Sequence, residues 1–398
     1  MDTILYPIPA KETLREQKKR ILDRIYDHHL RLWGGSEGNV FFISDTYPGL
    51  WLEHTFDGIA WADYMPAEHA VSANQVRLFL SHQREDGQLP CYIWADQIGY
   101  GQIQECVSFG SLCLDAVRQN PDDADLLSDC YRGVSAWVGW LKNNRRTLGT
   151  PLIEMFCGYD TGHDNSGRLR GLKYEGNTGK NAAWCPDDDD ALPILAPDMN
   201  ANFFGNHMAL AKMAELLGRP GEAETWRRDA EIIRRAMFEQ LWDEDRQFFY
   251  DVDRHGQKRY VTSCSITNVF IEGVMDYDLG NAVFDRYIAS PAHFGTPYPI
   301  PAVSVSDPTW VQNKPGNSWG YYSQGLTSLR TLRWMPDYGR TAEMEEIMRR
   351  WISAWSYSDS TQFGQELHPI TGRPSECSQW YSSCMLYFLH AIRRLYDI

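Results

Sequence analysis

The segment APDMNANFFGNHMALAKMAELLGRPGEAETWRRDAEIIRRAMFEQL, residues 196–241, decides the fold class of this chain. Apolar side chains recur at helical spacing on both sides of GRPGE, residues 218–222, which predicts helices over 200–217 and 221–241. The Gly and Pro between them stop the first helix and start the second. The segment is therefore expected to form two antiparallel helices joined by a short turn.

Helical periodicity extends over most of the chain, whereas strand periodicity is almost absent. A short hairpin is expected over residues 242–256, with almost no sheet elsewhere. No change of composition marks a linker, so residues 1–398 are expected to form one domain. The remaining expected helices cover residues 11–33, 51–64, 66–82, 103–119, 124–143, 263–275, 279–288, 319–333, 340–355 and 379–396.

Four long loops interrupt the helices, at residues 34–49, 145–197, 289–317 and 357–377. Loops of this length inside a compact domain are usually functional. Helix pairs joined alternately by short turns and long loops predict an all-α (α/α)6 barrel, a closed toroid whose long loops form a site at one mouth. An α-solenoid would need a repeat of fixed length, and the sequence has none.

The composition is that of an ordinary globular protein, with 43 % hydrophobic and 23 % charged residues. The formal net charge of −15 leaves no basic block for phosphates, so neither nucleic acid nor a membrane surface is an expected partner. Nine scattered cysteines without a CxxC pair indicate buried thiols in a reducing compartment. With a charged N-terminus and no apolar spanning run, these features predict a cytoplasmic protein and leave self-association open.

Two loops, FCGYDTGHDNSGR at residues 156–168 and FGQELHPITGRP at residues 363–374, each place an acidic residue among glycines and aromatic residues. Such carboxylates suit the floor of a pocket better than core packing. Two of them converging on one pocket could supply the acid and base for glycosidic bond cleavage, so Asp164 and Glu366 are the leading catalytic candidates. Alternatively, Asp164 forms a turn and Glu366 is a capping or salt-bridged residue.

Several segments together resemble the catalytic domain of glycoside hydrolase family 63 and, more loosely, its trehalase relatives. NQVRLFLSHQREDGQLPCYIW, residues 74–94, is similar to the family's Q-x-x-D-G-x-L-P turn, and residues 196–218 resemble its core helices. GHDNSGR, residues 162–168, resembles the loop of the general acid, and QELHPITG, residues 365–372, that of the general base. Residues 294–308 are similar to a pocket-lining loop between them.

The resemblance runs from about Leu50 to the C-terminus and implies an inverting, exo-acting α-glycoside hydrolase. It gives Asp164 the role of general acid and Glu366 that of the base that activates water. The compact chain is similar to short bacterial members that act on small α-glucosides or α-mannosides such as glucosylglycerate and mannosylglycerate.

Three departures from the family pattern bear on the substrate more than on the reaction. Gly167 stands where the acid loop usually has Pro. Residues 313–322 read NKPGNSWGYY and lack the Arg expected there. Residues 51–57 read WLEHTFD, with Glu53 near the position of the family's Asp.

Asp160 is a competitor of Asp164: it is either the acid itself or a neighbour that raises the pKa of Asp164 by like-charge repulsion. His163 and Arg168 are expected to bind sugar hydroxyls or a carboxylate on the aglycone; otherwise Arg168 pairs with Asp160 or Glu154. Gln104 and Glu105 are expected to face the same mouth. With core packing as the alternative, the expected substrate-binding residues are Trp51, Glu53, His54, Asp57, Gln104, Tyr159, Asp160, His163, Arg168, Trp319, Tyr321, Gln324, Trp380 and Tyr381.

Two rival functions remain open at this point. Sugar epimerases similar to N-acylglucosamine 2-epimerases use histidines in the same barrel, and the chain offers His54, His163, His207 and His368. A non-catalytic carbohydrate-binding barrel is the other rival. The acidic run at residues 187–190 could gather Ca²⁺ but lacks the spacing of a calcium loop, so neither metal nor cofactor is expected.

Overall fold

The computed structural model describes residues 5–47, 49–174, 176–177, 181–310, 317–357 and 362–398. Within these residues the chain forms twelve α-helices, so the helix-rich expectation is confirmed. Their bounds are α1 Lys11–Arg24, α2 Thr55–Tyr64, α3 Ala70–Ser81, α4 Phe109–Gln119, α5 Leu126–Asn144, α6 Pro197–Leu216, α7 Pro220–Gln240, α8 Ile266–Ile271, α9 Tyr277–Val283, α10 Gly325–Trp334, α11 Thr341–Tyr357 and α12 Ser382–Tyr396.

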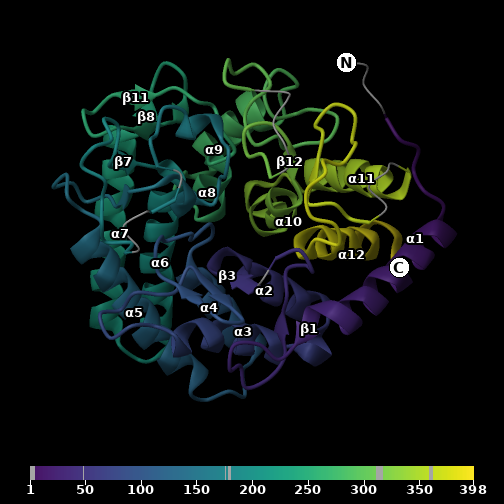
Figure 1. Ribbon diagram of the computed structural model, residues 1–398, viewed down its shortest axis with the longest axis horizontal. Helices are drawn as coiled ribbons and strands as arrows, with labels where there is room; N and C mark the ends of the chain where they lie inside the picture. Colours follow the sequence, from purple (N-terminus) through teal and green to yellow (C-terminus); the bar gives the residue numbers. More distant parts are fainter. Residues whose placement is uncertain (1–4, 48, 175, 178–180, 311–316, 358–361) are drawn as a thin grey trace.

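The even-numbered helices form an inner ring. α2 packs on α4, α4 on α6, α6 on α8, α8 on α10 and α10 on α12, and α12 closes the ring by packing on α2. Figure 1 shows these helices around the centre, with α3, α5, α7, α9, α11 and α1 outside them. The ring places residues that lie more than 300 positions apart in the sequence, such as Asp57 and Ser382, in direct contact.

The pair α6–α7 follows the sequence signals that predicted it. Pro197 and Pro220 stand at the first position of each helix, where a missing N–H is harmless, and Gly218 ends the first helix with φ +71°. α6 is buried over most of its length, as an inner helix must be. α7 buries only a stripe that includes Ile233 and Met237, which is typical of an outer helix.

Several predicted helices begin later than expected, and the two largest differences, of six residues each, serve the site. The helix expected over 103–119 begins at Phe109, because Ile103 donates its N–H to the Asp160 side chain and Gln104 adopts φ 50°. The helix expected over 319–333 begins at Gly325, because the backbone before it pairs with the loop of Glu366.

The expectation of almost no sheet beyond hairpins is confirmed only in part: the strands are short, but five small sheets are present in the described residues. β8 and β9 form the predicted hairpin, whereas the sheet β11–β10–β7–β6 joins distant segments. Strands of two or three residues leave no alternation that a sequence could reveal. Their bounds are β1 Leu30–Arg31, β2 Val40–Phe41, β3 Gly49–Trp51, β4 Tyr92–Trp94, β5 Ile98–Gly99, β6 Glu154–Met155, β7 Ile194–Leu195, β8 Trp242–Asp243, β9 Phe248–Phe249, β10 Asp251–Val252, β11 Lys258–Arg259, β12 Ser323–Gln324 and β13 Glu366–Leu367.

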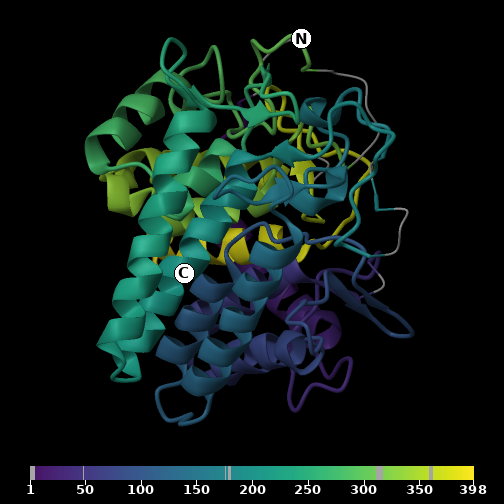
Figure 2. The same ribbon diagram turned by 90° about the vertical axis from the view of Figure 1, so that its left-hand side faces the viewer.

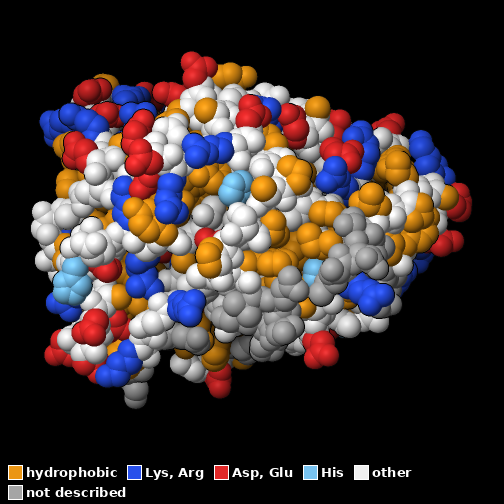
Figure 3. All heavy atoms as spheres, turned by 90° about the horizontal axis from the view of Figure 1, so that it is seen from above, with side chains coloured by type: hydrophobic (Ala, Val, Ile, Leu, Met, Phe, Trp, Pro, Cys, Tyr) orange, Lys and Arg blue, Asp and Glu red, His pale blue; other side chains and the backbone are white. Residues whose placement is uncertain are grey.

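The long loops gather on one side of the ring, at the right of Figure 2, whereas the helical hairpins occupy the rest. On the face seen in Figure 3, acidic and basic side chains are mixed around an apolar central area. No helix among the described residues is long and apolar enough to cross a membrane.

Candidate active site

The starts of the inner helices lie on the loop side of the ring. Glu53 and His54 precede α2, Gln324 precedes α10 and Tyr381 precedes α12. Tyr381 Oη lies 2.6 Å from His54 Nε2, which joins the first and last of these helix starts. Because helix N-termini carry partial positive charge, this end of the ring favours anionic groups.

All four long loops meet here, and Asn317 joins the two leading candidates. The Asn317 N–H donates to Glu366 Oε1 (2.9 Å), and its side-chain Nδ2 donates to Asp164 Oδ2 (2.8 Å). From the first loop, Tyr47 donates its hydroxyl to Gln365 Oε1 (2.7 Å). The two carboxylates, roughly 200 residues apart in sequence, are therefore brought together by their shared contact with Asn317.

Close backbone approaches fix the loop of Asp164. The Trp319 N–H donates to the Asp164 carbonyl (3.0 Å), and Asn165 Nδ2 donates to the Asn317 carbonyl (3.0 Å). A Cβ at Gly167 would overlap the Thr309 hydroxyl, which accounts for Gly at a position where the family usually has Pro. Asn165 adopts φ 59°, a left-handed conformation that Asn tolerates better than most residues.

Glu366 is fully buried and its carboxylate accepts several hydrogen bonds. Besides the Asn317 N–H, its Oε2 accepts from the Ser318 N–H (3.0 Å) and from Gln324 Nε2 (2.5 Å). Burial raises the pKa of Glu366, and these donors oppose that shift because they favour the ionised form. Gln324, one of the expected substrate-binding residues, thus lies beside Glu366.

Tyr47 is a site residue that the sequence analysis missed. Burial raises the pKa of its hydroxyl, and Cys377, Glu53, Asp164 and Glu366 raise it further. Glu53, Asp164 and Glu366 are therefore all near enough to Tyr47 to affect its hydroxyl. Nothing in the local sequence distinguishes Tyr47 from the chain's other 20 tyrosines, so only the tertiary structure identifies it.

Glu53 lies on the inner side of the site. Gln104 Nε2 donates to Glu53 Oε1 (3.4 Å), and the other oxygen is 3.8 Å from Arg330 Nη2. Burial raises the pKa of Glu53, and burial together with the Arg330 charge lowers that of His54 well below its usual range. The structure thus brings together Glu53, His54, Gln104 and Tyr381, and adds Arg330, which the sequence analysis also missed.

Asp57 joins two helices of the inner ring and does not bind at the mouth of the barrel. Its carboxylate accepts from the Ser382 hydroxyl (2.5 Å) and the Ser383 hydroxyl (2.9 Å), so it fastens α2 to the start of α12. Burial raises the pKa of Asp57 to about 7, although both serines and Arg330 oppose the shift.

The Asp57→Asn variant is expected to gain thermal stability over the wild type as pH rises from about 4 to 7. The folded-state pKa is raised, so the contribution of Asp57 is complete below its unfolded pKa and is lost as pH rises through the folded value. Asparagine stays neutral and can still bond the rotatable serine hydroxyls. Calorimetry at pH 5 and pH 8 measures this, with the exposed Asp122→Asn variant as control. A constant difference between wild type and Asp57→Asn would contradict it.

Asp160 lies in a buried ion pair. It accepts from Arg145 Nη1 (2.6 Å) and Nη2 (3.2 Å), and from the N–H groups of Ile103 and Phe156 (both 2.8 Å). The Cys157 N–H donates to it as well (3.2 Å). These partners fold the start of the acid loop onto Arg145, which suits a structural anchor.

Arg168 is fully engaged inside the protein, which corrects the expected pairing with Asp160 or Glu154. Its Nε and Nη2 donate to Asp251 (2.9 and 2.6 Å), and both Nη groups donate to Asp198. Nη1 also lies 2.8 Å from His163 Nδ1. All five donors are used, so none remains for a substrate. Burial lowers the pKa of His163 to about 3, which leaves its ring neutral.

Replacing Arg168 with methionine is expected to destabilise the protein by about 3–5 kcal/mol, because two buried carboxylates lose their partner. Chemical denaturation measures the free energy of unfolding, and the exposed Arg170→Met variant is the matched control. A loss for Arg168→Met no larger than for the control would contradict the anchoring role.

Aromatic candidates divide between the site and the framework. Trp319 stacks on His163 with ring centroids 4.5 Å apart, and Trp51 packs near Tyr47 and Trp94. Tyr321 is buried beside Trp310 and His368, and Tyr159 is half-buried in the acid loop.

Trp380 and Glu105 do not lie where the sequence analysis expected. The Trp380 ring packs against Arg20 and Arg24 of α1, which corrects its expected role as a sugar platform. Glu105 is buried among α4, α5 and α6, where it accepts from the Phe109 N–H and Trp137 Nε1, so it does not face the mouth.

The acidic run at residues 187–190 contacts the protein itself. Asp188 pairs with Lys173, and Asp189 accepts the N–H groups of Lys173 and Ala191. In the part of the chain that the structure describes, no group of three or more His, Cys, Asp or Glu side chains could hold a metal ion.

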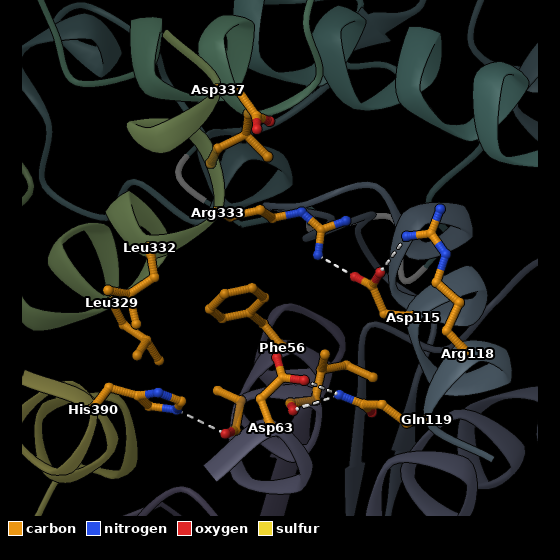
Figure 4. Close-up of a pocket in the computed structure, with 13 residues that line it drawn as sticks. Phe56, Asp63, Asp115, Arg118, Gln119, Leu329, Leu332, Arg333, Asp337 and His390 are labelled. Atoms are coloured by element: carbon orange, nitrogen blue, oxygen red, sulfur yellow. Dashed lines mark hydrogen bonds and ion pairs between the residues drawn. The ribbon is translucent and has the colours of Figure 1, made fainter. Parts of the chain in front are cut away.

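A cavity of about 620 Å³ opens at the other ends of the inner helices. Figure 4 shows its lining, in which Asp115 is held by Arg118 and Arg333, while Gln119 bonds Asp63. None of the catalytic candidates lines it.

A closed ring of helices with two loop carboxylates in one mouth fits a glycoside hydrolase. The sequence model of the mannosylglycerate hydrolase MGH1-like glycoside hydrolase domain matches residues 54–383, so the chain belongs to this family and is a glycosidase. The resemblance to glycoside hydrolase family 63 is thereby confirmed.

Solved structures agree on the fold. The GH63 mannosylglycerate hydrolase of Thermus thermophilus in complex with Tris is 16 % identical, with a TM-score of 0.74 over 95 % of this chain and 99 % of that one. Neutral trehalase Nth1 of Saccharomyces cerevisiae is 11 % identical, with a TM-score of 0.65 over 98 % of this chain and 81 % of that one. No curated protein matches the chain in sequence.

Proposed function

We propose that the protein is an inverting, exo-acting α-glycosidase for a small α-glucoside or α-mannoside, with Asp164 as general acid and Glu366 as general base. The observation that carries the proposal is the double contact of Asn317 with both carboxylates. The proposed frame is a single (α/α)6 barrel domain over residues 1–398, which the closed inner ring supports.

Asp164 suits the acid role better than Asp160. The Asp160 carboxylate is occupied by Arg145 and by three backbone N–H groups, whereas a general acid has to reach the leaving oxygen of the substrate. Asp164 is only partly buried. Like Glu53 and Glu366, it is near enough to Tyr47 to raise the pKa of the Tyr47 hydroxyl. A donor to Asp164 Oδ2 is the neutral amide of Asn317, whereas Asp160 faces the guanidinium of Arg145.

The proposed mechanism is a single displacement. Asp164 donates its proton to the leaving oxygen as the glycosidic bond breaks, and Glu366 takes a proton from the water that attacks the anomeric carbon on the opposite face. Asn317 contacts both carboxyl groups, through its backbone N–H and its side-chain Nδ2. The proposed inversion requires a separation of about 6.5–9.5 Å between them, which leaves room for the attacking water.

A glycosylglycerate is the first substrate to test. The Thermus thermophilus hydrolase was solved with Tris and D-glycerate bound, and the present chain matches its fold over nearly its whole length. Four loops contribute Tyr47, Asp164, Asn317 and Glu366 to one mouth, an arrangement that suits a pocket for one or two sugar-sized units. Arg168 is not available to bind glycerate, because its donors are paired with Asp198 and Asp251.

The deciding experiment offers purified protein a panel of α-glucosides, α-mannosides and their glycerate conjugates and follows the products by NMR. We expect release of a free sugar whose initial anomeric configuration is opposite to that of the substrate. Retained configuration would exclude inversion, and turnover of none of the panel would overturn the substrate assignment. Equal turnover of neutral disaccharides and glycerate conjugates would remove the preference for glycerate.

The epimerase alternative is less well supported. His54 contacts Tyr381 and His163 contacts Arg168, and burial lowers the pKa of both histidines. His207 is buried inside α6 and contacts the Phe203 carbonyl. An isomerised free sugar in the same NMR experiment would favour an epimerase, and binding without any turnover would favour a carbohydrate-binding barrel.

A further inference from the structure

Arg330 is a buried cation without the hydrogen bonds that such a group needs. The residue is 2 % exposed, and neither Nε nor Nη2 has a hydrogen-bond partner in the described part of the chain. Its one ion pair there is with Glu53 Oε2, at 3.8 Å, which is beyond hydrogen-bonding distance. A guanidinium has five N–H donors, and leaving them unpaired in a protein interior is costly.

The groups around Arg330 are also incompletely paired. The Glu53 carboxylate has the Cys106 thiol as a hydrogen-bond partner, but its Oε2 accepts no N–H or O–H among the described residues. His54 Nδ1 has no hydrogen-bond partner among them and lies 3.7 Å from Glu53 Oε1. His54 Nε2 is occupied by the Tyr381 hydroxyl. The buried Arg330 and His54 side chains thus present nitrogen atoms that have no hydrogen-bond partner in the described part of the chain. Buried polar atoms are normally paired, so this cluster indicates a ligand.

The position of Arg330 places that ligand deep in the barrel. α10 begins directly after Gln324, which donates a hydrogen bond to Glu366. Arg330 is the sixth residue of α10, so its backbone lies about 8 Å along the helix from that start. Gly162 of the acid loop lies beside this cluster, because a Cβ built on it would be 3.2 Å from Glu53 Oε2. In an exo-acting barrel the inner end of the site holds the non-reducing sugar, and the aglycone points outward.

We propose that Arg330 and Glu53 together bind two adjacent hydroxyls of this sugar, Arg330 as donor and Glu53 as acceptor. The proposal rests on the proposed glycosidase function and adds a sugar-binding residue to it. A positive and a negative group side by side suit a neutral diol, because each hydroxyl both donates and accepts. A carboxylated sugar is disfavoured, because its charge would lie against Glu53. A simple counter-ion role for Arg330 would leave its Nε and Nη2 donors unused.

Binding of free glucose and free mannose, measured by calorimetry and by ligand-observed NMR, tests the proposal without any need for hydrolysis. We expect wild type to bind at least one of them and Arg330→Met to weaken that binding by at least about 10-fold, with Glu53→Gln similarly affected. The control is Arg333→Met, three residues further along α10, whose partner Asp115 lies in the opposite cavity. If Arg330→Met does not fold, Arg330→Lys, which keeps the positive charge, replaces it in the binding measurements.

The deoxy analogues of the bound sugar identify the contact. Removing the contacted hydroxyl should weaken binding to wild type and cause little further loss in Arg330→Met. Unchanged sugar binding by a folded Arg330→Met protein overturns the role of Arg330 while leaving the glycosidase function intact. Sugar binding that depends on Arg330, without hydrolysis of any glycoside, overturns the glycosidase function and keeps the site. Wild type that binds neither sugar overturns the Arg330 proposal outright.

Discussion

Asp164→Asn is expected to lower kcat for an α-glycoside with a poor leaving group by about 10²–10⁴-fold, because the leaving oxygen loses its proton donor. The substitution keeps shape, and the new side-chain oxygen can still accept from Asn317 Nδ2. The fold and the thermal midpoint are therefore expected to stay close to those of wild type. Steady-state kinetics with the best glycoside from the substrate panel measures the effect.

An α-glycosyl fluoride separates loss of the acid from general damage. Fluoride leaves without protonation, so Asp164→Asn should hydrolyse this substrate nearly as fast as wild type. The exposed Asp187→Asn variant, from the same long loop, should match wild type on both substrates. Full activity of Asp164→Asn on the poor leaving group would pass the acid role to Asp160, despite the pairing of Asp160 with Arg145.

Glu366→Gln is expected to lower kcat by a similar factor of about 10²–10⁴, and the fluoride substrate should not restore it, because water activation is needed for every leaving group. The opposite response to the same substrate distinguishes the base from the acid. Glu376→Gln, exposed in the same loop, is the matched control. Recovery of Glu366→Gln activity with the fluoride would contradict the base role.

The environment of Glu366 adds two measurable consequences. Both carboxylate oxygens accept N–H donors, so the new amide group of the Glu366→Gln variant has to face at least one of them, and we expect a lower thermal midpoint for this variant.

Burial raises the pKa of Glu366, and a base works only when ionised. Activity of the wild type should therefore fall with decreasing pH at values above the ordinary range for glutamate. Asp164→Asn should keep this acidic limb.

The local sequence was enough to predict the helices and the two catalytic candidates. Helical spacing of apolar residues and the Pro and Gly signals around α6 and α7 depend on neighbours in the chain, so they are visible without the fold. The Gly-rich loops of Asp164 and Glu366 are visible for the same reason. The strands were missed because two-residue pairings such as β6 with β7 carry no periodic signal.

Partners that are distant in sequence set the limits of the prediction. Arg168 has the character of a ligand-binding arginine until Asp198 and Asp251, 30 and 83 residues away, take up its donors. Trp380 has the character of a sugar platform until α1 supplies Arg20 and Arg24. In both cases the residue type was informative, but its use depended on which charges the fold brought to it.

The sequence by itself determined a helix-rich glycosidase with long loops and one carboxylate in each of two of them. The tertiary structure decided which groups complete the site: Asn317 between Asp164 and Glu366, Tyr47 near three carboxylates, and Arg330 beside Glu53. The physical reason is that helix formation and turn chemistry are governed by residues a few positions apart. Hydrogen bonding, burial and pKa at the site are governed by groups that only closure of the helical ring brings within a few ångströms.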